Sequence, residues 1–101
     1  MQVVFTDRAL SDIEALRAYI SEDNPSAARE QVRTILSKIA LLAENPMLGR
    51  SGRVSGTREL VIAGTRYVVA YLIDGELIRI LAVIHGNRDL TSMEQKPWAV
   101  G

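Results

Sequence analysis

The basic side chains in the second half of the sequence and its only histidine are the groups best suited to chemistry on an anion. Arg66 and Arg79 lie in β-rich runs, and the segment Ile84-His85-Gly86-Asn87-Arg88 adds an imidazole and a further guanidinium. Arginine presents a flat fork of donors that matches carboxylate and phosphate groups. Histidine changes its charge near neutral pH. Such a set suits binding of an anion or acid–base chemistry on one.

Each of these residues also has a purely structural interpretation. Arg79 on an exposed sheet face would be a solvated residue that pairs with Glu59 or Glu76. His85 at a strand end would serve as a hydrogen-bonding residue of the fold. Arg88 stands beside Asp89, so an ion pair inside a turn suits it as well as an anion contact does.

The bulk composition indicates a single domain over residues 1–101. The chain is 48% apolar and 24% charged, which is ordinary for a soluble globular protein. The absence of cysteine excludes disulfides and thiolate metal sites, and a single histidine argues against a histidine-based zinc site, so we expect no cofactor. No run approaches the roughly 20 apolar residues of a membrane span. The N-terminus has no signal-like pattern, and we therefore expect a cytoplasmic protein without a membrane partner.

The first half of the sequence predicts a strand followed by a helical hairpin. Residues 2–5 are β-branched and aromatic, and Thr6 suits the N-cap of a helix that begins at Asp7. A second helix begins at Pro25 and is stopped by Asn45-Pro46. Apolar residues recur at three- and four-residue steps along both helices, at Leu10, Ile13, Leu16 and Ile20, then Ala28, Val32, Ile35, Leu36, Ile39 and Leu42.

The second half predicts a three-stranded antiparallel meander after an exposed loop at 49–53. The β-rich runs are 57–62, 66–72 and 77–85, separated by Ala63-Gly64-Thr65 and by Asp74-Gly75. Residues 91–101 have only weak local preferences and stay unassigned. The fold class is therefore α+β, with the two helices packed on one face of the sheet.

An Asp74-Gly75 turn predicts that Leu72 opposes Leu77, which in turn sorts the side chains onto two faces. The face toward the helices carries only apolar and aromatic residues, namely Tyr67, Val69, Tyr71, Ile78, Ile80, Ala82 and Ile84. The opposite face carries Arg66, Arg79 and His85 and is expected to be partly open. Arg58 joins it if the preceding turn has three residues, and lies on the other face if the turn has two.

Five segments, in this order and at this spacing, resemble the RelE/ParE toxin superfamily, and they cover nearly the whole chain. They are Asp23-Asn24-Pro25-Ser26-Ala27-Ala28, Asn45-Pro46-Met47-Leu48-Gly49-Arg50, Gly56-Thr57-Arg58-Glu59-Leu60, Tyr67-Val68-Val69-Ala70-Tyr71 and Val83-Ile84-His85-Gly86-Asn87-Arg88-Asp89. The resemblance implies the toxin of a bacterial type II toxin-antitoxin pair. It also implies a partner, a small antitoxin that holds the toxin inactive in a hetero-oligomer.

The superfamily has two branches with different chemistry. The RelE-like branch cleaves messenger RNA on the ribosome, with two lysines two apart on the second strand, an arginine opening the third, an arginine after the fourth and a tyrosine six residues later. Here Arg58 and Leu60 stand at the lysine positions, Arg66 and Arg88 match the arginines, and Glu94 stands at the tyrosine position. The phosphate-binding positions are kept and the proton-handling ones are lost.

This departure, with the Gly56–Leu60 and His85–Asp89 segments, favours the ParE-like branch, which inhibits DNA gyrase without being a known nuclease. In that interpretation the residues that bind are Arg58, Arg66, Arg79, His85 and Arg88. The alternative is ribosome-dependent cleavage of mRNA, in which His85 supplies the acid or base between Arg66 and Arg88.

Overall fold

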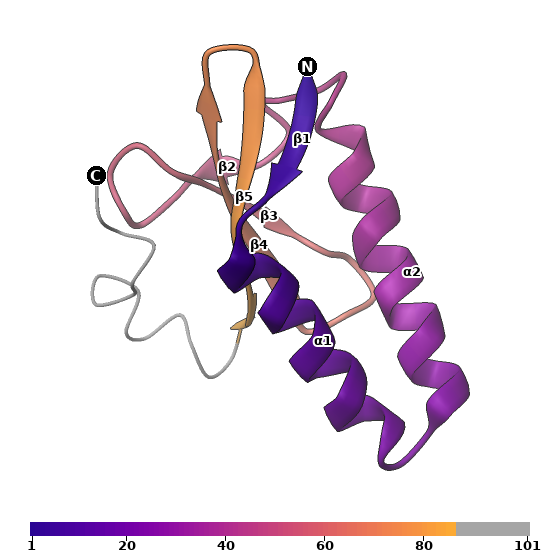
Figure 1. The fold of residues 1–101 in the computed structure, drawn as a ribbon. Helices are drawn as coiled ribbons and strands as arrows, with labels where there is room; N and C mark the ends of the chain where they lie inside the picture. Colours follow the sequence, from indigo (N-terminus) through magenta and orange to yellow (C-terminus); the bar gives the residue numbers. More distant parts are fainter. Residues whose placement is uncertain (87–101) are drawn as a thin grey trace.

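The computed structural model describes residues 1–86 as a five-stranded mixed sheet with two helices (Figure 1). In chain order the elements are β1 (Gln2–Phe5), α1 (Asp7–Ser21), α2 (Pro25–Leu41), β2 (Arg50–Ser51), β3 (Arg58–Val61), β4 (Tyr67–Asp74) and β5 (Leu77–His85). The strand order is β1-β5-β4-β3-β2, with β1 parallel to β5 and the other pairs antiparallel. The α+β class and the predicted meander, β3 to β5, are confirmed.

Local sequence signals set the helix starts. The Thr6 hydroxyl accepts the N–H of Ala9, and the Asn24 side chain accepts the N–H of Ala27 with Pro25 in the first turn. Each cap satisfies one of the backbone donors that a helix start leaves unpaired. The end of α2 comes earlier than predicted, at Leu41, where tight turns follow and Asn45 binds the Leu41 carbonyl through both its N–H and its side chain.

Both helices cover one face of the sheet, as predicted (Figure 1). Leu16 from α1 and Ile35 and Ile39 from α2 are buried against the strands. The strand residues of this core include Leu60, Tyr67, Val69, Tyr71, Ile78, Ile80 and Val83. Burial of such side chains supplies most of the driving force for folding, at roughly 25 cal/mol per Å² of apolar surface.

The predicted turn between β4 and β5 is wrong by one residue. Asp74 pairs with Leu77, so the loop is Gly75-Glu76, and Leu72 opposes Arg79 instead of Leu77. Gly75 has φ +59°, whereas Glu76 does not have a positive φ. An Asp-Gly loop of type I′ needs a positive φ at both positions. Gly75 therefore occupies the first position of the loop, and Asp74 is the last residue of β4.

A β-bulge in β5 changes which residues face the helices. Tyr71 pairs with Ile80 and Ala70 pairs with Ala82, so Leu81 is an extra residue without a partner. The alternation of side chains shifts by one after this point. Val83 consequently enters the core beneath the helices, while the residues predicted there, Ala82 and Ile84, lie on the opposite face.

The opposite face is not partly open, contrary to the sequence-based expectation. Val68, Ala70, Leu81, Ala82 and Ile84 form a second buried cluster on it, with Leu72 packed against them. The predicted loop at 49–53 also contains a strand, because β2 pairs with the start of β3 at the sheet edge. Within residues 1–86 there is no helix that is long and apolar enough to cross a membrane.

Candidate anion-binding cleft

A cleft of about 730 Å³ opens where the far end of α1 meets the ends of β4 and β5. Two helices, two strands and a loop contribute to its lining, which comprises Tyr19, Ile20, Gln31, Gly64, Thr65, Arg66, Tyr67 and His85. None of these side chains is acidic. The cleft thus brings together two predicted site residues, Arg66 and His85, that lie nineteen positions apart in the sequence.

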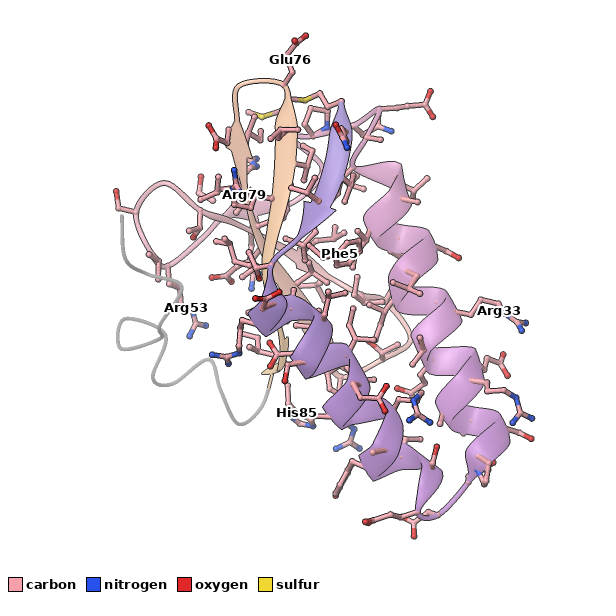
Figure 2. All side chains as sticks on the ribbon, in the orientation of Figure 1. Phe5, Arg33, Arg53, Glu76, Arg79 and His85 are labelled. Atoms are coloured by element: carbon pink, nitrogen blue, oxygen red, sulfur yellow. The ribbon has the colours of Figure 1, made fainter. Side chains whose placement is uncertain are left out.

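The bulge in β5 places the His85 side chain in this cleft. His85 is the cross-strand partner of Tyr67, and the two rings meet edge to face with centroids 5.6 Å apart and planes at 82°. Figure 2 shows His85 at the end of β5 beside α1. The sequence predicted that His85 shares a face with Arg79, which is wrong, because Arg79 lies between the core residues Ile78 and Ile80 and so points the other way.

Arg66 is held by its backbone and presents its side chain to solvent. The preceding loop is closed by Thr65, whose hydroxyl donates to the Ile62 carbonyl at 2.9 Å and accepts the Tyr67 N–H at 3.1 Å. Gly64 supplies the positive φ of +84° that this loop needs. The Arg66 carbonyl accepts the N–H of Gly86 at 2.7 Å, so the loop is joined to the end of β5.

The electrostatics of the cleft favour an anion. The Arg66 guanidinium is exposed and makes no ion pair within the described residues, and no carboxylate lines the cleft beside it. A concave site with an uncompensated cation raises the local concentration of anions. His85 adds an imidazole ring, whose two nitrogens can donate or accept a hydrogen bond. The arrangement can hold a phosphate or carboxylate next to one proton donor or acceptor.

Arg79 is remote from the cleft. It forms an ion pair with Asp74 at 3.0 Å near the β4–β5 turn, and it lies six positions before His85 on β5, which is roughly 20 Å of extended strand (Figure 2). The structural interpretation of Arg79 as an ion-paired residue therefore applies, with Asp74 as the partner in place of a glutamate. Arg88, Glu94 and the segment 91–101 lie outside the described residues.

Arg58 is also absent from the cleft lining. It opposes Tyr71 across β3 and β4, and its guanidinium donates to the carbonyls of Gly49 at 3.0 Å and Met47 at 3.3 Å. Five residues, 62–66, connect β3 to β4, so neither of the two turn lengths considered for Arg58 occurs. Arg58 holds the loop that precedes β2.

Sequence reasoning missed two cleft residues that come from the helices. Tyr19 lies between the buried stripe positions of α1 and is 61% exposed. An aromatic side chain on the polar side of an amphipathic helix is a signal that could have identified it. Gln31 of α2 carries no such signal. Tyr67, which the sequence assigned to the core, belongs to both the core and the cleft.

Among residues 1–86 no three His, Cys, Asp or Glu side chains gather as a metal site would require. One pKa shift stands out, on the outer surface of α1. The hydrogen bonds from Arg17 hold the pKa of the Glu14 carboxyl below its usual value. This pair lies on one turn of the helix, three residues apart.

The chain is similar to toxins of type II toxin-antitoxin systems. A family model described as the ParE toxin of the type II toxin-antitoxin system parDE matches residues 3–90. The putative toxin Y4kP of Sinorhizobium fredii is 39% identical over 87 residues, which is 86% of this chain and 90% of that protein. Toxin RelE2 of Caulobacter vibrioides is 37% identical over 87 residues, covering 86% and 97%.

The same similarity holds in three dimensions. A solved structure of a chromosomal ParDE TA system from P. aeruginosa contains a chain that superposes with a TM-score of 0.76. That chain is 25% identical in sequence, and the match covers 84% of this chain and 95% of the other.

Proposed function

Because the chain belongs to the ParE family of type II toxins, which act in pairs with an antitoxin, we propose that it arrests growth by binding DNA gyrase and not by cleaving RNA. The proposal places its action in the cytoplasm, where gyrase works on the chromosome. It requires no cofactor.

The observation that carries the proposal concerns the two positions where the RelE-like pattern has lysines. Leu60 is 8% exposed and packs in the core. Arg58 uses its guanidinium to bind the carbonyls of Gly49 and Met47. Cleavage by a 2′-hydroxyl needs a base for that hydroxyl and an acid for the leaving oxygen. In this chain both positions serve the fold, so they leave no side chain free to move a proton.

The test is a supercoiling assay with purified toxin, gyrase and relaxed plasmid. We expect supercoiling to fall as toxin is added and to return when the antitoxin is supplied in excess. Full supercoiling at a large molar excess of toxin would contradict the proposal. A heat-unfolded sample of the same protein is the matched control, because it has the same charge and composition without the fold.

A specific observation supports cleavage of mRNA as a second candidate. The exposed Arg66 and the single histidine share one cleft, which has no acidic lining residue. Primer extension on a message in a translating extract tests this function. New 5′ ends that disappear with His85→Gln would establish it, whereas an unchanged message would exclude it.

The antitoxin has a candidate docking site on the outer face of the helical hairpin. A groove there is lined by Arg17, Arg29 and Arg33 around the apolar Val32 and Leu36. An acidic amphipathic segment that folds on binding would match both the charge and the apolar floor. We assign this groove to the antitoxin in a hetero-oligomeric complex. Charge reversal at Arg33 should weaken that complex and leave gyrase inhibition unchanged.

A further inference from the structure

The loop between α2 and β2 presents two large apolar side chains to solvent. Met47 is 65% exposed, which is the largest value among the apolar residues described as exposed, and Leu48 is 50% exposed. We call these two residues the Met47–Leu48 knuckle. Exposed apolar side chains are common singly. Two in succession at the tip of a loop need an explanation when the chain also fixes that loop firmly.

A buried tyrosine fixes the loop on both sides of the knuckle. Tyr71 lies in the centre of β4 and is fully buried, and its hydroxyl donates to the Pro46 carbonyl at 2.7 Å. The same oxygen accepts the N–H of Gly49 at 2.8 Å. One side chain of the core therefore joins the residue before the knuckle to the residue after it.

The cross-strand neighbour of this tyrosine adds a second clamp. Arg58 donates to the carbonyls of Gly49 and Met47, so the loop has two attachments to the sheet. Gly49 packs so closely that a Cβ atom there would lie 2.7 Å from the Tyr71 ring. Between Pro46 and Gly49 the backbone has little freedom to move.

The following segment is tied down by a buried carboxylate. Glu59 is 1% exposed, and its Oε2 accepts the N–H of Arg53 at 2.9 Å while Arg50 lies 3.7 Å from Oε1. Residues 46–59 contain three arginines and this one acidic side chain, which is buried. Residues 46–59 consequently carry a net positive charge.

We infer that the Met47–Leu48 knuckle is the element with which this toxin engages its protein target, a folded surface that offers an apolar pocket with an acidic rim. This inference rests on the proposed function, since it names the contact by which the inhibitor would bind. A clamped loop loses little conformational entropy on association, so its apolar side chains contribute more of their burial energy to affinity. A rigid loop with exposed apolar side chains fits a preformed pocket, whereas a segment that folds on binding needs a groove like the one between the helices.

The decisive variant is Met47→Ser/Leu48→Ser, which removes the apolar surface without touching the clamps. Truncating two central anchors of an interface typically weakens binding by about tenfold or more. We expect the toxin concentration for half-inhibition of supercoiling to rise by about that factor. The thermal unfolding midpoint should stay close to that of the wild type, because both side chains are exposed.

Two further variants serve as controls. Leu10→Ser removes an equally exposed leucine, 54%, from α1, and inhibition should be unchanged. Tyr71→Phe keeps the knuckle and loosens its clamp, so inhibition should weaken less than in the double serine variant. If the double variant inhibits as well as the wild type while folded, the inference is overturned.

Growth arrest in cells that lack the antitoxin separates this inference from the proposed function. If wild-type toxin arrests growth but leaves gyrase active, the proposed target is wrong. In that case a double serine variant that is folded but no longer arrests growth still supports the knuckle as the target contact. A double serine variant that arrests growth like the wild type overturns it.

Discussion

Tyr67 and His85 face each other directly across β4 and β5, with their rings edge to face at 5.6 Å, because Leu81 stands as an extra residue in β5. Without this bulge the alternation of β5 would place His85 on the face away from the helices. The bulge thus places His85 in the cleft that Arg66 also lines.

Replacing His85 by glutamine separates a proton-transfer role from a structural one. A binding toxin needs no proton at this position, so growth arrest should persist in His85→Gln. His85→Ala should lower the free energy of unfolding by about 1 kcal/mol, because it removes the aromatic contact with Tyr67. Chemical denaturation and growth curves measure the two effects. A stable His85→Gln protein that fails to arrest growth would favour the nuclease.

The cleft should bind simple anions through Arg66. Titration with inorganic phosphate should shift the NMR signals of the His85 ring, since both residues line the same cleft. Arg66→Gln should weaken this binding by about tenfold, as expected for the loss of a hydrogen bond to a charged group. Arg79→Gln is the matched control, because Arg79 is paired with Asp74 at the other end of β5. Equal phosphate affinities of the Arg66→Gln and wild-type proteins would contradict an anion site at Arg66.

The caps and the helical hairpin could be predicted from sequence because their signals are local. Thr6 and the Asn24-Pro25 pair each act within one turn of the helix that they start. The bulge could not be predicted, since every residue from Ile80 to Ile84 is apolar and the alternation that would identify the extra one is absent.

The residues that line the cleft could not be predicted from the sequence for a different reason. Tyr19 and Gln31 reach it only after both helices have packed on the sheet, and no spacing in the sequence encodes that geometry. The sequence gives no signal that distinguishes the role of Arg58 from that of Arg66. In the structure Arg58 binds a loop carbonyl, whereas Arg66 lines the cleft.

Asp12 should stabilise the strand end that carries His85. Its Oδ2 accepts the N–H of Val83 at 3.0 Å, and its carboxylate also pairs with Arg8. Asp12→Ala leaves that backbone donor without its partner and should cost about 1–3 kcal/mol of stability. Asp12→Asn retains an acceptor and should cost less. Urea unfolding of both variants checks the order, and equal losses would contradict the assigned role.

Acid should remove the contribution of the Glu14–Arg17 pair to stability. The hydrogen bonds from Arg17 lower the pKa of Glu14 in the folded state. A carboxyl whose pKa is lower when folded stabilises the protein above its unfolded pKa, and the effect disappears as the pH falls through the folded value. Arg17→Gln should return the Glu14 pKa toward its usual range, as measured by NMR titration of the carboxyl carbon. An unchanged titration in this variant would rule out Arg17 as the cause.

Gly49 should tolerate no side chain, for steric reasons alone. A Cβ atom would lie 2.7 Å from Tyr71 Cε1 and Oη and 2.8 Å from the Glu59 carbonyl, and the φ of Gly49 is not positive. Overpacking of this kind costs about 1–3 kcal/mol, so Gly49→Ala should unfold at lower urea concentration. Combining Gly49→Ala with Tyr71→Phe removes one of the clashing atoms, and the double variant should be more stable than the sum of the single effects predicts.

Gly56→Ala is the matched control, since a Cβ there meets no atom within 4 Å but the backbone has φ +83°. Its cost should be about 1 kcal/mol from backbone strain and should be independent of Tyr71→Phe. Additive effects at Gly49 and Tyr71 would show that the two residues do not share the contact that fixes the knuckle.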